Sequence, residues 1–284
     1  MLTSRINFKN FKFKRNSKIK LNLIKLIKKK NSILESLGKN YKDSYNKKDL
    51  TIFKKYRNFR LIGMGGSTLG AQAIYDFLKP NIKKYFEFID NLKNYQNKNK
   101  KKIVNIVISK SGNTIETIVN ANILIKKNDK NIFITENKIN HLYLLAEKLK
   151  AKIIHHNNFI GGRYSVLSEV GMIPAELMGL NINHFRQFNS LIKNKIFFNN
   201  LISNVAATID LIRDKKFNSI IINYDESSDN LFRWYQQLIA ESLGKKNKGL
   251  LPIISTMPKD NHSVMQLYLD GFKNNFFTLF FVKE

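Results

Sequence analysis

The sequence predicts an α/β protein with two parallel sheets, each flanked by helices. Short apolar runs rich in β-branched and aromatic residues alternate with helical patterns from about residue 59 onward. Most of these runs are apolar at nearly every position. Strands that are buried on both faces have this continuous pattern, because helices cover a parallel sheet on both sides.

The order of these elements predicts the domain organisation. We expect strands at residues 59–62, 103–109, 132–135, 152–156, 219–224, 251–256 and 276–282, and helices at 68–78, 114–127, 141–149, 229–243 and 262–269. Residues 183–214 carry no strand signal and are expected to be a helical connection. The predicted parts are therefore a Lys- and Asn-rich helical segment (1–58), a first domain (59–182), the connection (183–214) and a second domain (215–284).

Composition limits the class of protein. The 284 residues are 43% hydrophobic, with 21 Phe and 11 Tyr, which is enough for a substantial core. No run approaches the ~18 apolar residues of a membrane span. The absence of cysteine excludes disulfides and cysteine-based metal or nucleophile chemistry. The basic start of the chain lacks the apolar core of a secretion signal, so we expect a cytoplasmic protein.

The net charge of +28 raises nucleic-acid binding as a hypothesis. The basic residues are nearly all lysines, however, and they are spread along the chain. No zinc-finger spacing, basic zipper or RNA-recognition signature accompanies them. We therefore expect no dedicated nucleic-acid site, and a more modest role for the charge in attracting anionic substrates.

A glycine-rich turn follows the first predicted strand. It contains Gly63, Gly65, Gly66 and Ser67, and a helix comes next. Glycines permit positive φ and close approach of a ligand, and a helix N-terminus favours an anion or a polar sugar. The turn is neither a dinucleotide fingerprint, because Thr68 stands where that motif needs glycine, nor a P-loop. A purely structural tight turn is the alternative.

A second turn, after the strand at 103–109, is rich in hydroxyl groups. Ser109, Lys110, Ser111 and Thr114 stand where the strand is expected to give way to a helix. Hydroxyls and free backbone N–H groups can bind a phosphate without a metal, aided by the helix dipole. The alternative is a helix cap by Thr114. A cap needs only one hydroxyl, so the group favours a phosphate site.

Two further motifs carry a cation and an imidazole. Gly161 and Gly162 precede Arg163, and this arrangement could project the guanidinium into a cleft, where it would stabilise an oxyanion or enediolate. A surface arginine in a turn is the alternative. We expect Asp260 or Asn261 to cap a helix whose first turn holds His262, which disfavours the charged imidazole. The remaining histidines are interpreted as structural; they are His141, His155, His156 and His184.

The predicted helix at 229–243 carries an unusual acid. At 3.6 residues per turn, Trp234, Gln237 and Glu241 form one row at the edge of its buried face. A carboxylate beside an aromatic ring and an amide can be partly desolvated, which raises its pKa and suits it to proton transfer. A solvated glutamate at the helix edge is the alternative.

Taken in order, these five motifs resemble those of the phosphoglucose isomerase family, from about residue 59 to Gly271. The family is built from two sugar-isomerase (SIS) domains, each a parallel sheet flanked by helices. It interconverts glucose 6-phosphate and fructose 6-phosphate without metal or organic cofactor. The resemblance implies this activity, and a homodimer in which the histidine comes from the neighbouring subunit.

The resemblance also implies a role for each motif residue. The phosphate would be bound by Ser109, Lys110, Ser111 and Thr114. Gly66 and Ser67 would lie along the sugar, and Gln237 would hold the substrate near Glu241. The implied catalytic residues are Glu241 as the base between C1 and C2, Arg163 on the cis-enediolate, and His262 in ring opening.

One feature of the family has no counterpart. The resemblance implies a catalytic lysine in a helical segment near the C-terminus, well after the histidine motif, and that lysine has no counterpart in this sequence. We therefore expect an incomplete second domain with an uncovered apolar surface. This leaves a non-catalytic SIS module that binds sugar phosphate as the alternative function.

Overall fold

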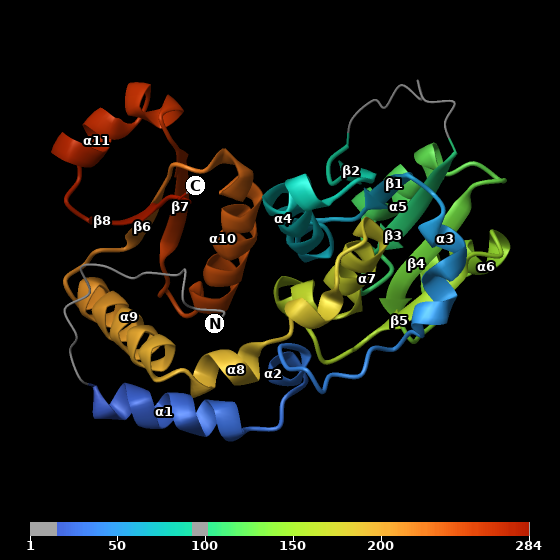
Figure 1. Cartoon of the computed structure of the whole chain (residues 1–284). Helices are drawn as coiled ribbons and strands as arrows, with labels where there is room; N and C mark the ends of the chain where they lie inside the picture. The colour runs from blue at the N-terminus through green and yellow to red at the C-terminus, as the bar shows by residue number, and fades with distance from the viewer. Residues whose placement is uncertain (1–15, 93–101, 284) are drawn as a thin grey trace. The chain divides into compact units, whose positions relative to one another are not determined.

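The computed structural model of the chain describes residues 16–92 and 102–283 (Figure 1). It divides into two compact units. The five-stranded unit comprises Lys42–Ile182 and Ser227–Leu238, and the three-stranded unit comprises Met1–Tyr41, Asn183–Glu226 and Ile239–Glu284. The first part of the predicted N-terminal helical segment, residues 1–15, lies outside the described residues. Each unit contains a parallel sheet with helices, so the predicted α/β class is confirmed.

The larger sheet has the strand order β2-β1-β3-β4-β5, and all neighbouring strands are parallel. Its strands are β1 (Asn58–Ile62), β2 (Tyr85–Ile89), β3 (Ile103–Ile108), β4 (Lys130–Glu136) and β5 (Lys152–His156). Four of them were predicted. The fifth, β2, was not predicted, because Glu87 interrupts its apolar run.

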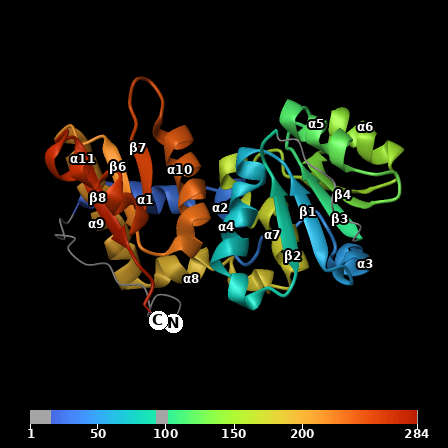
Figure 2. The ribbon, with the colours of Figure 1, turned by 90° about the horizontal axis from the view of Figure 1, so that it is seen from above.

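Helices cover both faces of this sheet (Figure 2). They are α4 (Leu69–Phe77), α5 (Ile115–Leu124), α6 (His141–Lys148) and α7 (Glu169–Met178). On one face, α5 and α6 contribute Ala121, Leu142 and Ala146 to a core that includes Val107 and Phe133 of the sheet. On the other face lie α4 and α7. The expected covering of a parallel sheet on both sides is thus confirmed.

A row of polar side chains crosses the larger sheet. Glu87, Arg60, Asn105 and Asn131 are register partners on four neighbouring strands. The Arg60 Nε lies 2.9 Å from Glu87 Oε2, and Asn105 Nδ2 donates to Asn131 Oδ1 at 2.9 Å. Because a slip by one residue would break these pairs and turn apolar side chains to the wrong face, the row helps to fix the register. The same register sets the positions of the carboxyl ends of these four strands relative to one another.

The smaller sheet has the order β7-β6-β8, again parallel. Its strands are β6 (Asn218–Asn223), β7 (Leu251–Thr256) and β8 (Asn275–Phe280), all close to the predicted ranges. Helix α11 (Met265–Asp270) packs Met265 and Tyr268 against Ile220 and Ile222 of β6. The predicted connection forms α8 (Phe188–Lys193) and α9 (Lys195–Arg213). Figure 1 shows α1 (Ser17–Lys28) beside α9.

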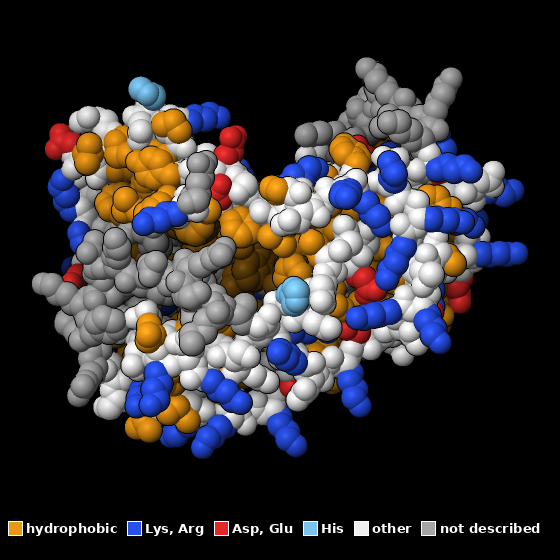
Figure 3. Space-filling model, in the orientation of Figure 1, with side chains coloured by type: hydrophobic (Ala, Val, Ile, Leu, Met, Phe, Trp, Pro, Cys, Tyr) orange, Lys and Arg blue, Asp and Glu red, His pale blue; other side chains and the backbone are white. Residues whose placement is uncertain are grey.

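Exposed apolar side chains gather on β8 and beside it. They include Leu267, Phe272, Phe277 and Leu279. In Figure 3 an apolar patch covers the region of α11 and β8, while Lys and Arg side chains are spread over the described surface in that view. None of the described helices is both long and apolar enough to cross a bilayer.

Helix α10 (Asp229–Leu243) has the predicted bounds, and the division between the units falls within it, after Leu238. Two short helices, α2 (Ser32–Ser36) and α3 (Thr51–Lys54), complete the α-helices of the described residues.

Candidate functional site

Two of the predicted loops meet at the carboxyl edge of the larger sheet. Strands β1 and β3 are neighbours, and the chain leaves β1 toward β2 on one side but continues from β3 toward β4 on the other. In open α/β sheets such a reversal of strand order opens a crevice at the carboxyl ends of the two strands, and ligands bind there. The glycine-rich loop follows β1 and the hydroxyl loop follows β3, so both border this crevice.

The hydroxyl loop is internally ordered. The Ser109 Oγ and Thr114 Oγ1 atoms lie 2.9 Å apart, and Ser109 Oγ also accepts the backbone N–H of Gly112 at 3.2 Å. Thr114 occupies the N-cap position of α5, but its side chain makes no capping hydrogen bond. The helix-cap alternative for its hydroxyl is therefore wrong. The paired hydroxyls of Ser109 and Thr114 thus stand at the N-terminus of α5, where helices commonly bind anions.

Gly112 is required for this loop. Its φ of +67° lies in the left-handed region, and a Cβ there would lie 1.9 Å from Asn140 Oδ1. Asn140 is buried and caps α6 through a hydrogen bond from the Tyr143 N–H at 2.9 Å. Asn140 was not predicted as a site residue, although an asparagine directly before a predicted helix is a capping signal. Asn140 therefore packs the base of the candidate phosphate loop.

The glycine-rich loop packs against the loop that carries Arg163. A Cβ on Gly66 would lie 2.3 Å from the carbonyl carbon of Gly162. The hydroxyl of Ser165 donates to the Gly162 carbonyl at 2.7 Å, and it lies 3.3 Å from that of Gly66. Close packing thus accounts for glycine at position 66. Ser67 follows in the same short 3-10 turn.

Arg163 lies in a 3-10 helix, Gly162–Leu167, and its side chain is half-buried. The guanidinium carbon is 4.5 Å from the centroid of the Tyr164 ring, a cation–π arrangement. The Trp234 indole N–H donates to the Arg163 carbonyl at 3.2 Å. Backbone and guanidinium are both held, which differs from the alternative of an ordinary surface arginine in a turn.

Lys110 links the hydroxyl loop to the segment before Arg163. Its Nζ donates to the Asn158 carbonyl at 2.6 Å. Gln237 approaches the glycine-rich loop, because its Nε2 lies 3.0 Å from the position of a Cβ on Gly65. The five-stranded unit therefore contains Gly66, Ser67, Ser109, Lys110, Ser111, Thr114, Arg163 and Gln237.

Glu241 and His262 belong to the three-stranded unit. Glu241 follows Gln237 by one turn of α10, as predicted, but its side chain is exposed, so the expected partial burial beside Trp234 is absent. His262 is also exposed.

The predicted helix at 262–269 forms as α11, but its predicted start at His262 is wrong. His262 ends a 3-10 helix, Lys259–His262, and α11 begins only at Met265 without a side-chain cap. The Asp260 carboxylate instead accepts the Thr256 N–H at 2.9 Å and the Ser263 hydroxyl at 3.0 Å. Because these bonds close a turn directly after β7, Asp260 does not cap an α-helix over His262.

Comparisons with known proteins give the family. The phosphoglucose isomerase family model matches residues 43–253. Glucose-6-phosphate isomerase of Methanocaldococcus jannaschii is 36% identical over 249 residues, which cover 81% of this chain and 61% of that protein. The Campylobacter jejuni enzyme is 33% identical over 254 residues, covering 81% and 62%. The chain thus spans about three-fifths of the length of these curated relatives.

Solved structures support the fold. A hypothetical protein of Thermus thermophilus superposes with a TM-score of 0.73 at 23% identity, covering 92% of this chain and 69% of that one. A glucose-6-phosphate isomerase of Chlamydia trachomatis gives a TM-score of 0.61 at 18% identity, covering 87% and 57%. From the family model and the sequence identities, the chain belongs to the phosphoglucose isomerase family.

Proposed function

We propose that this chain acts in the isomerisation of glucose 6-phosphate and fructose 6-phosphate. The observation that carries the proposal is the ordered hydroxyl loop, with Ser109 and Thr114 at the reversal of strand order. A phosphate anchored there by Ser109, Lys110, Ser111 and Thr114 leaves the sugar free to extend along Gly66 and Ser67. Membership of the family supports the choice of a hexose 6-phosphate.

The proposed chemistry is a proton transfer between neighbouring carbons. In the open-chain aldose, the Glu241 carboxylate removes the proton from C2, and the electron pair moves through the C1–C2 bond onto the carbonyl oxygen. The resulting cis-enediolate carries negative charge that the guanidinium of Arg163 stabilises. The proton of the C2 hydroxyl then passes to O1, the electron pair on O2 forms the C2 carbonyl, and Glu241 returns its proton to C1, which gives the ketose. His262 assists ring opening, and Gln237 holds the substrate beside the base.

The domain roles, assembly and location belong to the same proposal. Residues 59–182 would bind the phosphate and sugar, 183–214 would connect the domains, and 215–284 would supply Glu241 and His262. The protein would work as a cytoplasmic homodimer, without nucleic acid or membrane and without metal or organic cofactor. The lack of cysteine and the spread of basic residues are compatible with these expectations.

Replacement of the proposed base tests the mechanism. Glu241→Gln should lower kcat by roughly 10²–10⁴-fold, because a general base contributes about that much. Exposed Glu226 in the same unit provides the control Glu226→Gln, which should keep full activity. Full activity of Glu241→Gln would refute the assigned role.

A second candidate is a sugar-phosphate-binding module without catalysis. The observation that favours it is the exposure of Glu241 and His262, in contrast to the ordered phosphate loop. Exchange of the C2 proton of glucose 6-phosphate with deuterium oxide separates the two functions. An isomerase incorporates deuterium, whereas a binding module binds the sugar phosphate and leaves C2 unlabelled.

A further inference from the structure

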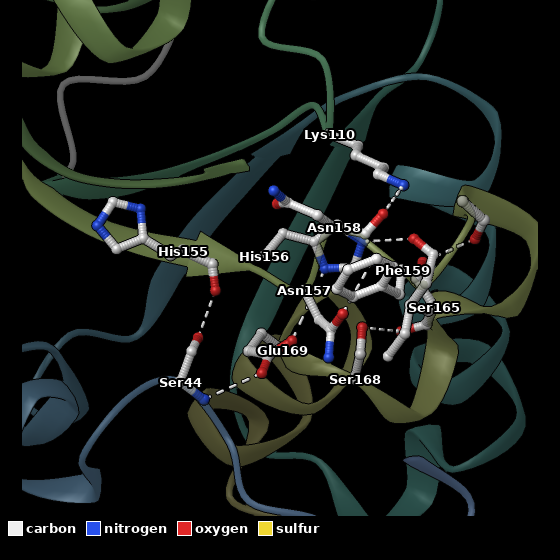
Figure 4. A network of polar contacts seen from close by, with 12 residues as sticks. Ser44, Lys110, His155, His156, Asn157, Asn158, Phe159, Ser165, Ser168 and Glu169 are labelled. Carbon is white, nitrogen blue, oxygen red and sulfur yellow. Dashed lines mark hydrogen bonds and ion pairs between the residues drawn. The ribbon is translucent and has the colours of Figure 1, made fainter. Parts of the chain in front are cut away.

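A buried pair of ionisable side chains lies beside the candidate site and has no role in the proposed chemistry. His156 is the last residue of β5, and Glu169 is the first residue of α7. They are 2% and 1% exposed. Figure 4 shows them with Ser44, Lys110 and the intervening segment Asn157, Asn158 and Phe159.

Both ring nitrogens of His156 face acceptors. Nε2 lies 3.0 Å from the Ile160 carbonyl oxygen, which can only accept, so Nε2 carries a hydrogen. Nδ1 lies 3.7 Å from Glu169 Oε2. That distance exceeds a hydrogen bond but suits an ion pair with an imidazolium. A ring protonated on both nitrogens is the form that matches both neighbours.

The carboxylate of Glu169 is stabilised in its charged form. Burial alone would raise its pKa, but the contact with His156 and the backbone N–H groups of Glu169 and Ser44 together hold the pKa below the usual value. The Ser44 N–H donates to Oε1 at 3.0 Å. The position at the start of α7 adds the favourable field of the helix N-terminus. A buried carboxylate in this state needs a cation beside it.

The pair holds one end of a short turn that leads to Arg163. Within the turn, the Ile160 N–H donates to the Asn157 carbonyl at 3.1 Å, and the Phe159 N–H donates to Asn157 Oδ1 at 2.9 Å. The His156 Nε2 hydrogen bonds to the Ile160 carbonyl, and the Lys110 Nζ donates to the Asn158 carbonyl. Gly161, Gly162 and Arg163 follow directly. The turn is thus fastened from the sheet and from the phosphate loop.

We infer that His156 and Glu169 are positioning residues, a buried imidazolium–carboxylate pair that fixes the turn 157–160 and thereby the placement of Lys110 and Arg163. Its consequence for catalysis rests on the proposed function, whereas the charged state of the pair does not. His156 was interpreted as a structural histidine. The inference gives it a specific structural role, because its ring connects the end of β5 to the segment that carries Arg163, the proposed enediolate-stabilising residue.

Nitrogen-15 NMR of the full chain tests the charged state directly. At pH 7, both ring nitrogens of His156 should give the chemical shifts of protonated nitrogens, assigned by their loss in His156→Gln. Glu169→Gln should convert the ring to the neutral form. A neutral His156 ring in the unmutated chain at pH 7 would overturn the inference.

Kinetics test the positioning role. Glu169→Gln should lower kcat/KM for glucose 6-phosphate by roughly tenfold to 10²-fold, since small misplacements of substrate-binding groups have effects of this size. Glu169→Asp, which keeps the charge, should restore part of the loss. The matched control is Glu176→Gln. Glu176 is also buried on α7, but it contacts Lys54 at 2.8 Å and Tyr45 at 3.2 Å, away from the turn.

The outcomes separate positioning from general stability. If both variants lose stability but only Glu169→Gln changes kcat/KM, the positioning role is supported. Equal kinetic effects of Glu169→Gln and Glu176→Gln would contradict it. If the unmutated chain neither isomerises nor binds glucose 6-phosphate, the proposed function fails, and the NMR result still decides whether the pair is charged. Should Glu169→Gln not fold, Glu169→Asp and the NMR of the unmutated chain decide.

Discussion

In the five-stranded unit the candidate residues other than Gln237 lie on loops and short 3-10 turns with closely packed glycines, whereas in the three-stranded unit Glu241 and His262 have exposed side chains. Gly66 and Gly112 each lie so close to neighbouring atoms that a methyl group would collide with them. The comparison teaches that one sheet and its loops can by themselves order the hydroxyl groups that we propose as the phosphate site.

Removing apolar side chains from the two sheets should give the largest difference. Phe133 of β4 is 0% exposed, so Phe133→Ala should lower the free energy of unfolding by about 3–5 kcal/mol. Leu279 of β8 is 66% exposed, and Leu279→Ala should change it by no more than ~0.5 kcal/mol. Urea denaturation measures both. A large loss in Leu279→Ala would mean that β8 is covered in solution.

Replacing glycine in the hydroxyl loop should have the next largest effect. In Gly112→Ala, the added methyl group would stand on a left-handed backbone and collide with the Asn140 side chain. The substitution should therefore lower the free energy of unfolding by about 1–3 kcal/mol and also weaken binding of glucose 6-phosphate. Gly179→Ala is the control, because Gly179 has a φ of +93° but no atom within 4 Å of the added Cβ. Binding is measured by calorimetry. Equal loss of affinity in both variants would contradict the role of Asn140.

Removal of one hydroxyl from the loop should weaken binding and also lower stability by about 1–3 kcal/mol, because buried Ser109 Oγ bonds Thr114 and the Gly112 N–H. Ser109→Ala should reduce the affinity for glucose 6-phosphate roughly tenfold to 10²-fold, as expected for one hydrogen bond to a charged group. Exposed Ser190 on α8 gives the control Ser190→Ala. Unchanged affinity in Ser109→Ala would place the phosphate elsewhere.

The fold could be predicted where burial follows local pattern. The continuous apolar runs predicted β3, β4 and β6 close to their observed bounds. The prediction failed at β2, because Glu87 interrupts its run and its partner Arg60 is distant in sequence. It also missed α7, in which Gly171 and Pro174 resemble helix breakers. Gly171 is there because Val166 packs against it, with the Val166 carbonyl oxygen 2.0 Å from a hypothetical Cβ.

The candidate site could be predicted as loops but not as contacts. Strand-to-helix transitions placed Ser109 and Thr114 at the carboxyl edge of the sheet, and the structure brings them together. The packing of Asn140 against Gly112 depends on the meeting of two loops about thirty residues apart. The turn after β7 likewise depends on bonds to Asp260, and local capping preference does not anticipate them. Tertiary contacts decided both cases.

The smallest effect we predict is the dependence of stability on Glu169 in acid. The folded pKa of Glu169 lies below its ordinary value of 4.5, so its charged form stabilises the fold above that pH. The contribution should be lost as the pH falls through the lower, folded value. Burial opposes the shift, which is why we expect a modest effect. The stability difference between the unmutated chain and Glu169→Gln, followed by urea denaturation from about pH 6 to about pH 3, should therefore shrink with falling pH. A stability difference that stays constant or grows as the pH falls would show that the Glu169 carboxylate is not held charged by its surroundings. The order of the loop before Arg163 would then need a cause other than this buried carboxylate.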